Sequence, residues 1–457
     1  MGELLHLDTL DFIVIIGSLA AVMYAGIIGA RKSALLSDVD YVLAGRSLTM
    51  PFFVASLVAT WYGAVLGSGE FIMRFGIVFI FCFGVPYYIV AILYASWLAK
   101  RIRTSKAISI PDQLGLAYGP RARTVSAIVM LIITIPASYQ LMLGVIVQSI
   151  TGWSLLISII VGTIVSLVYV LKGGFRSDVY ANVVQVCIMY AGFFALVVGC
   201  ILTFGLPTAI FSSVPDSHAH IPGPMGWMPI VGWFVVALQT FIDPNFHIRT
   251  AAAKNVKTAQ RGIFVSVALW MVFDVLQLLA GLYAVVYLTG VAPTNTFIAL
   301  AQAVLAPAWK GLFIAGVIAA VMSTLDGYAL VSATTIGHDL IDTWRQKAHR
   351  VRSLRLGLVI TATIGCITAW LVPSIIDLMY NAASIVVPAL LLPLLLSFTP
   401  RAKMFASSIV PIVVLPAFVS VISLSTKWGE PMFIGLASSV LLHLLRSFSR
   451  GFRTTSQ

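Results

Sequence analysis

Charge is scarce in this chain. Lys, Arg, Asp and Glu make up only 10% of its 457 residues, whereas 60% of the residues are hydrophobic. Soluble globular domains carry roughly 25% charged residues, so this composition excludes that class. The mean hydropathy of +1.01 and the long apolar runs instead predict an all-α polytopic membrane protein.

Several other signals are missing as well. The four cysteines lie inside apolar runs without metal-ligand spacing, which argues against a metal module or a disulfide scaffold. The seven histidines are scattered over both predicted sides of the membrane, which argues against a membrane transferase with histidine catalysis, and we expect no enzyme activity. The N-terminus has no basic region and no cleavage site, so the first apolar span is expected to be retained.

Thirteen apolar stretches are long enough to cross a bilayer. We predict a single transmembrane transporter domain over residues 1–457. It comprises an extra N-terminal span at 11–30, a ten-span core at 50–399 and two C-terminal spans at 404–446. The core spans are expected at about 50–72, 77–99, 124–149, 154–171, 180–205, 227–257, 262–290, 309–337, 354–373 and 376–399.

The basic residues predict the orientation in the membrane. Of the 28 Lys and Arg residues, all but Arg74, Lys310 and Lys427 fall on one side when these spans alternate. Cytoplasmic loops carry the excess of basic residues. We therefore expect a plasma (inner) membrane protein with its N-terminus outside and its C-terminus in the cytoplasm. The net charge of +12 is then a topology signal, and no nucleic-acid partner is expected.

A polar group lies at the centre of the eighth core span. Ser323, Thr324 and Asp326 interrupt the apolar run at 312–336. An acid at this depth is costly unless it faces a partner, an ion or water. Hydroxyl, carboxylate and carbonyl oxygens are ligands that hard cations prefer, so sodium is the obvious candidate. The alternative is that the hydroxyls bond to their own helix or to a neighbouring helix.

The first and sixth core spans are both interrupted. Small residues and glycines occur through residues 55–70, and Asp243, Pro244 and Asn245 break the sixth span. These spans hold corresponding positions in two five-span halves, and such paired interruptions indicate the binding site of a transporter built from an inverted 5+5 repeat. The alternative is a glycine-rich packing face and a simple proline kink.

Three segments resemble the sodium:solute symporter family, whose members have a LeuT-type core. They are residues 319–327 with Ser332 and His338-Asp339, the glycine-rich segment 172–185 that enters the fifth span, and Asp243-Pro244-Asn245-Phe246 followed by Arg249 and residues 251–255. The thirteen-span plan and its orientation also match the family. The resemblance therefore covers nearly the whole chain.

The resemblance implies a sodium site between the first and eighth core spans and a solute site at the two helix breaks. The sodium ligands would be the hydroxyls of Ser323 and Thr324 and the carbonyls of Ala320, Val54 and Leu57. The solute would contact Thr60, Trp61, Asp243, Asn245 and Tyr380. Trp61 and Tyr380 have an alternative role as packing aromatics, and Asp243 as a helix cap.

The chain departs from the family at a second cation site. Members with such a site have an aspartate where this chain has Asn182, and hydroxyls where it has Asp326 and Gly327. We predict a second cation site formed by Asp326 and Asn182, with the carboxylate supplied from the opposite helix. The occupant could be sodium or a proton, and the alternative is a structural acid hydrogen-bonded to Asn182.

Together these features predict a sodium-coupled symporter, with Na⁺ as coupling ion, that imports a small polar organic solute by alternating access. A proton-coupled symporter that uses Asp326 or Asp274 is the alternative. The expected partners are the solute and the lipid bilayer, without an obligate protein partner. The sequence does not name the solute.

Overall fold

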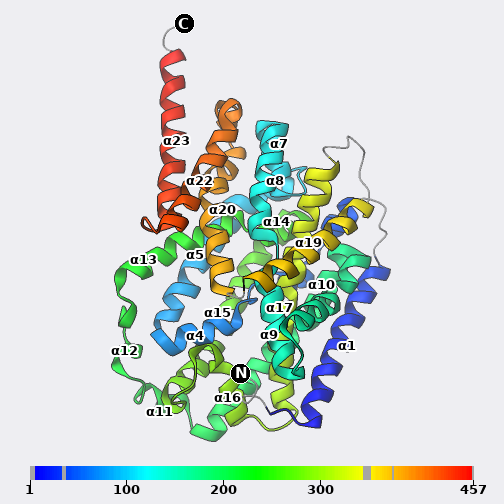
Figure 1. Cartoon of the computed structure of the whole chain (residues 1–457), viewed down its shortest axis with the longest axis vertical. Coiled ribbons are helices and arrows are strands. Elements are labelled where there is room, and N and C mark those ends of the chain that lie inside the picture. Colours follow the sequence, from blue (N-terminus) through cyan, green and yellow to red (C-terminus); the bar gives the residue numbers. More distant parts are fainter. Residues whose placement is uncertain (1–5, 33–37, 343–350, 373–374, 455–457) are drawn as a thin grey trace.

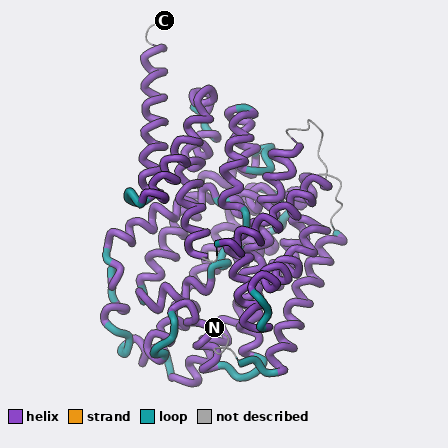
Figure 2. The backbone as a smooth tube through the Cα atoms, in the orientation of Figure 1, coloured by secondary structure: helices purple, strands orange, loops and turns teal. Residues whose placement is uncertain are grey.

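The computed structural model describes residues 6–32, 38–342, 351–372 and 375–454. In this part of the chain the secondary structure is helical throughout, and the single isolated β-bridge joins Leu48 to Ala253 (Figures 1 and 2). The predicted all-α class is confirmed.

Ten helices in the described part are long and apolar enough to cross a membrane, or eleven if one bent pair forms a single span. The chain is therefore a multi-pass membrane protein. Helix length alone does not establish the predicted thirteen spans, for two reasons. The two spans predicted at 154–171 and 180–205 lie in one 50-residue helix, α10 (Leu155–Phe204). The first core span is divided into two short helices, α3 (Met50–Ala59) and α4 (Val65–Phe75).

The other long segments correspond to predicted spans. They are α1 (Thr9–Arg31), α5 (Val85–Leu93) with its flanking turns, α8 (Pro120–Thr134) with α9 (Ala137–Thr151), α15 (Val256–Tyr287), α17 (Trp309–Thr334), α19 (Val351–Leu371), α20 (Ile375–Ser397), α22 (Ile409–Thr426) and α23 (Pro431–Thr454). A further short helix, α16 (Thr296–Val304), precedes α17. The C-terminal helix α23 extends beyond the other helices at the top of Figure 1.

Helix α10 is interrupted at Gly174. This residue has φ 59° and ψ −145°, outside the helical region. A Cβ atom there would lie 2.3 Å from the carbonyl oxygen of Tyr41, so only glycine fits. The interruption falls between the two predicted spans. The hydropathy of the sequence therefore indicates two spans, although backbone hydrogen bonds continue through α10 as one helix.

Both predicted helix breaks are present. Residues 60–64 form turns between α3 and α4. The sixth core span consists of α13 (Trp227–Val236), a 3₁₀ segment and α14 (Pro244–Ala252), with a bend of 41°. Asp243 at the bend is extended, with φ −65° and ψ 118°. This agrees with the effect of Pro244, which lacks an N–H and biases the preceding residue away from helix.

Helix α17 lies at the centre of the molecule. In its membrane window 94% of the residues are buried, against 67% or less for the other candidate spans. Its N-terminus is anchored by the first helix, because Asp11 Oδ1 accepts hydrogen bonds from the backbone N–H groups of Ala308 (2.9 Å) and Gly311 (2.7 Å). The helix that carries the polar group is thus held by α1 at its N-terminus and enclosed by its neighbours.

Candidate functional site

The hydroxyl pair of α17 lies directly against the end of α3. Ser323 Oγ is 2.7 Å from the carbonyl oxygen of Ala59, and Thr324 Oγ1 is 3.2 Å from that of Thr60. Both hydroxyls also contact the carbonyl of Ala320, at 2.9 and 3.0 Å. Five oxygens from the first and eighth core spans therefore meet at the first helix break. This is the kind of oxygen set that a hard monovalent cation needs.

The close approach of the two helices depends on a glycine. A Cβ atom at Gly63 would lie 2.6 Å from Thr324 Cβ, so a larger residue would push the helices apart.

The predicted carbonyl ligands are only partly placed with this pair. The carbonyl of Leu57 lies at the break, where it is 3.3 Å from Thr60 Oγ1. The predicted carbonyl of Ala320 does contact both hydroxyls, whereas the α3 carbonyls that contact them belong to Ala59 and Thr60, two and three residues beyond Leu57. Val54 lies a turn before Leu57, within α3. Val54 and Leu57 remain predictions as sodium ligands.

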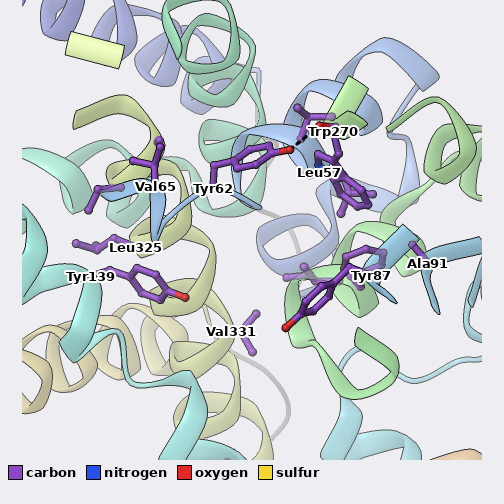
Figure 3. Packing of buried hydrophobic residues seen from close by; sticks show 14 of the residues in the cluster. Leu57, Tyr62, Val65, Tyr87, Ala91, Tyr139, Trp270, Leu325 and Val331 are labelled. Atoms are coloured by element: carbon purple, nitrogen blue, oxygen red, sulfur yellow. Dashed lines mark hydrogen bonds between the residues drawn. The ribbon is translucent and has the colours of Figure 1, made fainter. Parts of the chain in front are cut away.

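A cavity of about 290 Å³ adjoins the break. Three predicted solute contacts, Thr60, Trp61 and Asp243, line it. Figure 3 shows Tyr62, Tyr87 and Tyr139, which also line it, with the hydroxyls of Tyr87 and Tyr139 directed into the space between their helices. The remaining lining side chains come mostly from α4, α5, α8, α9, α15 and α20.

Trp61 belongs to an aromatic group beside this cavity. Its ring stacks on Trp270 at 4.7 Å and meets Tyr87 and Phe246 edge to face at 5.4 and 5.6 Å. Trp61 can therefore have both predicted roles, because its ring packs against these aromatic residues while the residue also lines the cavity.

Asp243 has two partners. Its Oδ1 accepts a hydrogen bond from the backbone N–H of Phe246 at 2.9 Å, which caps α14. Its Oδ2 accepts a hydrogen bond from the hydroxyl of Tyr328 at 3.0 Å. The capping alternative therefore describes one oxygen of the carboxylate, while the residue also lines the cavity.

The other two predicted solute contacts are placed differently. Asn245 Oδ1 accepts a hydrogen bond from Arg249 Nη1 at 2.9 Å, and it lies where a Cβ at Gly327 would be 2.4 Å away. Tyr380 is 38% exposed, and its neighbour Met379 lines the cavity instead. Among the described residues neither Asn245 nor Tyr380 borders the cavity, so their contact with solute remains a prediction.

The predicted second cation site has separate partners for its two residues. Asp326 is fully buried and accepts hydrogen bonds from Ser166 and Tyr169 in the first half of α10. Asn182, in the second half of α10, donates to Ser56 Oγ at 3.2 Å. Sequence reasoning did not identify Ser166 and Tyr169, because no local pattern shows that the fourth span packs against this face of α17.

A buried ion pair joins the two broken helices to α10. Arg249 Nη2 lies 3.2 Å from Asp178 Oδ2, and both side chains are fully buried. Arg249 Nε donates to Ser56 Oγ at 2.8 Å, and the guanidinium lies 5.4 Å from the ring centre of Phe175. Asp178 falls between the spans predicted at 154–171 and 180–205, so no local pattern pairs it with Arg249.

Asp274 has hydrogen-bond donors on three sides. Tyr62 OH is 2.9 Å from Oδ1, Gln277 Nε2 is 3.2 Å from Oδ1, and Tyr88 OH donates to Oδ2. The residue lines the same cavity as Asp243 and is 2% exposed. The sequence indicated Asp274 as a buried acid but none of these partners.

One group of metal-ligating side chains lies elsewhere. Asp112, His338 and Asp339 each offer a ligand atom within 4.8 Å of the others. Arg123 already supplies positive charge there, because its guanidinium lies 3.2 Å from Asp339 Oδ1 and 3.6 Å from Asp112 Oδ1. Ser109 Oγ also donates to Asp339 at 2.8 Å. This group joins α7 (Ile110–Tyr118), α8 and the π-helical segment Thr335–Asp342 that follows α17.

Solved structures of transporters share this fold. A substrate-bound, outward-open Na⁺-coupled sialic acid symporter superposes with a TM-score of 0.81, at 16% identity, over 95% of this chain and 96% of that chain. MHP1, a nucleobase-cation-symport-1 family transporter, has a TM-score of 0.62 at 14% identity, over 91% and 94%. The chain therefore has the fold of a secondary transporter, with LeuT-like architecture.

The sequence comparison shows the family. The model of the sodium:solute symporter family matches residues 41–404, and the chain belongs to that family. The high-affinity proline transporter PutP of Bacillus subtilis is 26% identical over 363 residues, 72% of this chain and 75% of that protein. The resemblance noted in the sequence is confirmed, and so is the prediction of a transporter rather than an enzyme.

Proposed function

We propose that the protein is a sodium-coupled symporter that imports a small polar organic solute by alternating access. The observation that carries this proposal is the meeting of Ser323 and Thr324 with the carbonyls of Ala59 and Thr60 at a helix break beside the cavity. Relatives described as sodium/proline, sodium/pantothenate and sodium/glucose transporters support both the ion and the solute class.

The geometry supports coupling between ion and solute. Thr60 provides a carbonyl to the hydroxyl pair and also lines the cavity. Sodium bound at the pair would fix the break in one arrangement, and the same residues would then present a formed cavity to the solute. An ion that stabilises the state in which solute binds best gives the two ligands a favourable coupling free energy.

The number of membrane spans and their orientation are part of the same proposal. Thirteen spans follow if α10 crosses twice around Gly174 and if α3 with α4 forms one broken span. The N-terminus would then be outside and the C-terminus cytoplasmic, in agreement with the distribution of basic residues. In that orientation the cavity lies on the outer side of the helix breaks.

The test is solute uptake into proteoliposomes under a sodium gradient. Ser323→Ala and Thr324→Ala each remove one oxygen, so we expect a higher sodium concentration for half-maximal uptake in both. Thr334→Ala is the matched control, because this threonine lies on the same helix and its hydroxyl bonds to the carbonyl of Leu330. Unchanged sodium dependence in both site variants would refute the sodium site.

Proton coupling remains the second candidate, since Asp274 and Asp326 receive hydrogen bonds from neutral side chains only. A pH gradient without sodium distinguishes the two. Uptake driven by that gradient and abolished in Asp326→Asn or Asp274→Asn would replace sodium by the proton.

A further inference from the structure

The described wall of the cavity has acidic side chains and no basic ones. Asp243 and Asp274 line it, whereas no Lys, Arg or His occurs among the described residues of its wall. The rest of the polar wall consists of hydroxyl and amide side chains, including Tyr62, Tyr139 and Gln277. An occupant of this space meets two carboxylates before it meets any basic side chain.

Asp274 has no basic partner among the residues that the structure describes. Its three donors, Tyr62, Tyr88 and Gln277, are neutral groups, and the residue is 2% exposed. Hydrogen bonds from neutral groups help a buried carboxylate, but a buried charge is normally paired with an opposite charge. The cavity is the side from which such a charge can come.

Asp243 offers a second carboxylate on the cavity wall. Its two partners are the backbone N–H of Phe246 and the hydroxyl of Tyr328. Arg249, on the same helix, is close enough to act on Asp243 electrostatically, but its guanidinium pairs with Asp178 at 3.2 Å and it is not among the residues that line the cavity. Both carboxylates therefore border the space that a solute would enter.

Aromatic faces complete the wall. Trp61, Phe79 and Phe83 line the cavity, and Tyr139 stacks on Tyr328 at 5.3 Å. Aromatic faces attract cations through the ring quadrupole and also accommodate an apolar body. An anion would meet two carboxylates and electron-rich rings without a basic side chain to offset them.

We propose that the transported solute carries a cationic nitrogen, bound by the carboxylate of Asp274 with Asp243 as the second acid, and has a small apolar body that fits the aromatic wall. The inference rests on the proposed transport function and specifies its substrate class. It covers amines, quaternary ammonium compounds and zwitterions whose nitrogen is charged. Solutes that carry only negative charge, and neutral sugars, fall outside it.

The first experiment needs no variant. The wild-type protein in sodium-containing buffer is screened by thermal shift and by competition of uptake, with pairs of compounds of equal shape. Choline is compared with neohexanol, its neutral carbon isostere, and L-proline with cyclopentanecarboxylate, which lacks the nitrogen. Lactate and glucose represent the anionic and neutral classes.

We expect at least one nitrogen-containing member to raise the melting temperature and be transported, and its isostere to bind more than tenfold more weakly. A ligand that binds only the folded state raises its stability, so the shift reports binding directly. Equal binding of both members of a pair, or transport of lactate or glucose alone, would overturn the inference.

The second experiment identifies the carboxylate. Asp274→Asn keeps the size and one acceptor, and we expect it to weaken binding of the cationic ligand more than tenfold. Glu70→Gln is the matched control: it removes one negative charge from α4, where Glu70 pairs with Arg74 at 2.8 Å outside the cavity wall. Unchanged affinity in Asp274→Asn would remove Asp274 from the binding site.

Failure of this inference differs from failure of the proposed function. If no compound shows sodium-dependent uptake, and sodium alone does not shift the melting temperature, the symport proposal fails. If sodium-dependent uptake is observed for a compound without a cationic nitrogen, symport stands and the substrate class is wrong.

Discussion

Two buried carboxylates of this protein, Asp178 and Asp274, have opposite surroundings. Asp178 lies on α10 opposite a guanidinium, 3.2 Å from Arg249, in a region where three helices meet. Asp274 lies on α15 at a cavity wall, with hydroxyl and amide donors only. A carboxylate paired with a basic side chain of the protein is typical of a group that holds helices together. A carboxylate without such a partner is typical of a ligand-binding site.

The largest effect on stability is expected at the ion pair. Asp178→Asn or Arg249→Gln leaves one buried charge without its partner and should destabilise the protein by about 3–5 kcal/mol. The double variant removes both charges and should recover much of that loss. Thermal unfolding in detergent measures all three. Equal, additive losses in the double variant would show that the pair is not a unit.

A smaller effect is expected at Asp326. Its partners are the hydroxyls of Ser166 and Tyr169. Tyr169→Phe deletes one of these bonds and should cost about 1–2 kcal/mol, without changing the sodium or pH dependence of uptake if Asp326 is structural. If Asp326 binds a second sodium, the wild type should show sigmoidal sodium dependence that becomes hyperbolic in Asp326→Ala. That outcome would place Asp326 with the ligand-binding acids.

The next smaller loss of stability is expected for variants of Asp243, which caps a helix and also borders the cavity. Asp243→Ala removes the acceptor for the Phe246 N–H and should cost about 1 kcal/mol, whereas Asp243→Asn keeps a capping oxygen and should cost less. Uptake separates the two roles. If Asp243→Asn transports like the wild type, the residue is a cap only.

The smallest stability change is expected at Asp274. In the absence of solute, Asp274→Asn removes a charge that no basic group neutralises, so its free energy of unfolding should stay within about 0.5 kcal/mol of the wild type or increase. Chemical unfolding without solute checks this. A loss comparable to that of Asp178→Asn would mean that Asp274 is also a structural acid.

The sequence predicted the helical class, the positions of both helix breaks and the polar centre of α17, because each of these depends on local signals. Pro244 predicts the second break through its own backbone, and a carboxylate among apolar residues marks Asp326 and Asp274. The family was predicted from three short segments, and the comparisons confirm it.

Contacts between helices could not be predicted from the sequence. The partners of Asp326 lie more than 150 residues away on α10, and Tyr62 and Tyr88 reach Asp274 from the turn at 60–64 and from α5. The register of the turn at 60–64 decides which carbonyls meet Ser323 and Thr324. That register is set by the packing of Gly63 against α17, which residue types alone do not specify.

The contact between Asp11 and the start of α17 has a consequence for biosynthesis. Asp11 is made early, and the amide of Ala308 that it binds follows 297 residues later. At roughly 5–20 residues per second, this interval is on the order of 15–60 s. Until the end of that interval the carboxylate of Asp11 lacks the backbone donors of Ala308 and Gly311. Helix α1 packs mainly against α10, which is made earlier, so the contact that holds the start of the helix carrying Ser323 and Thr324 is the late one of the two.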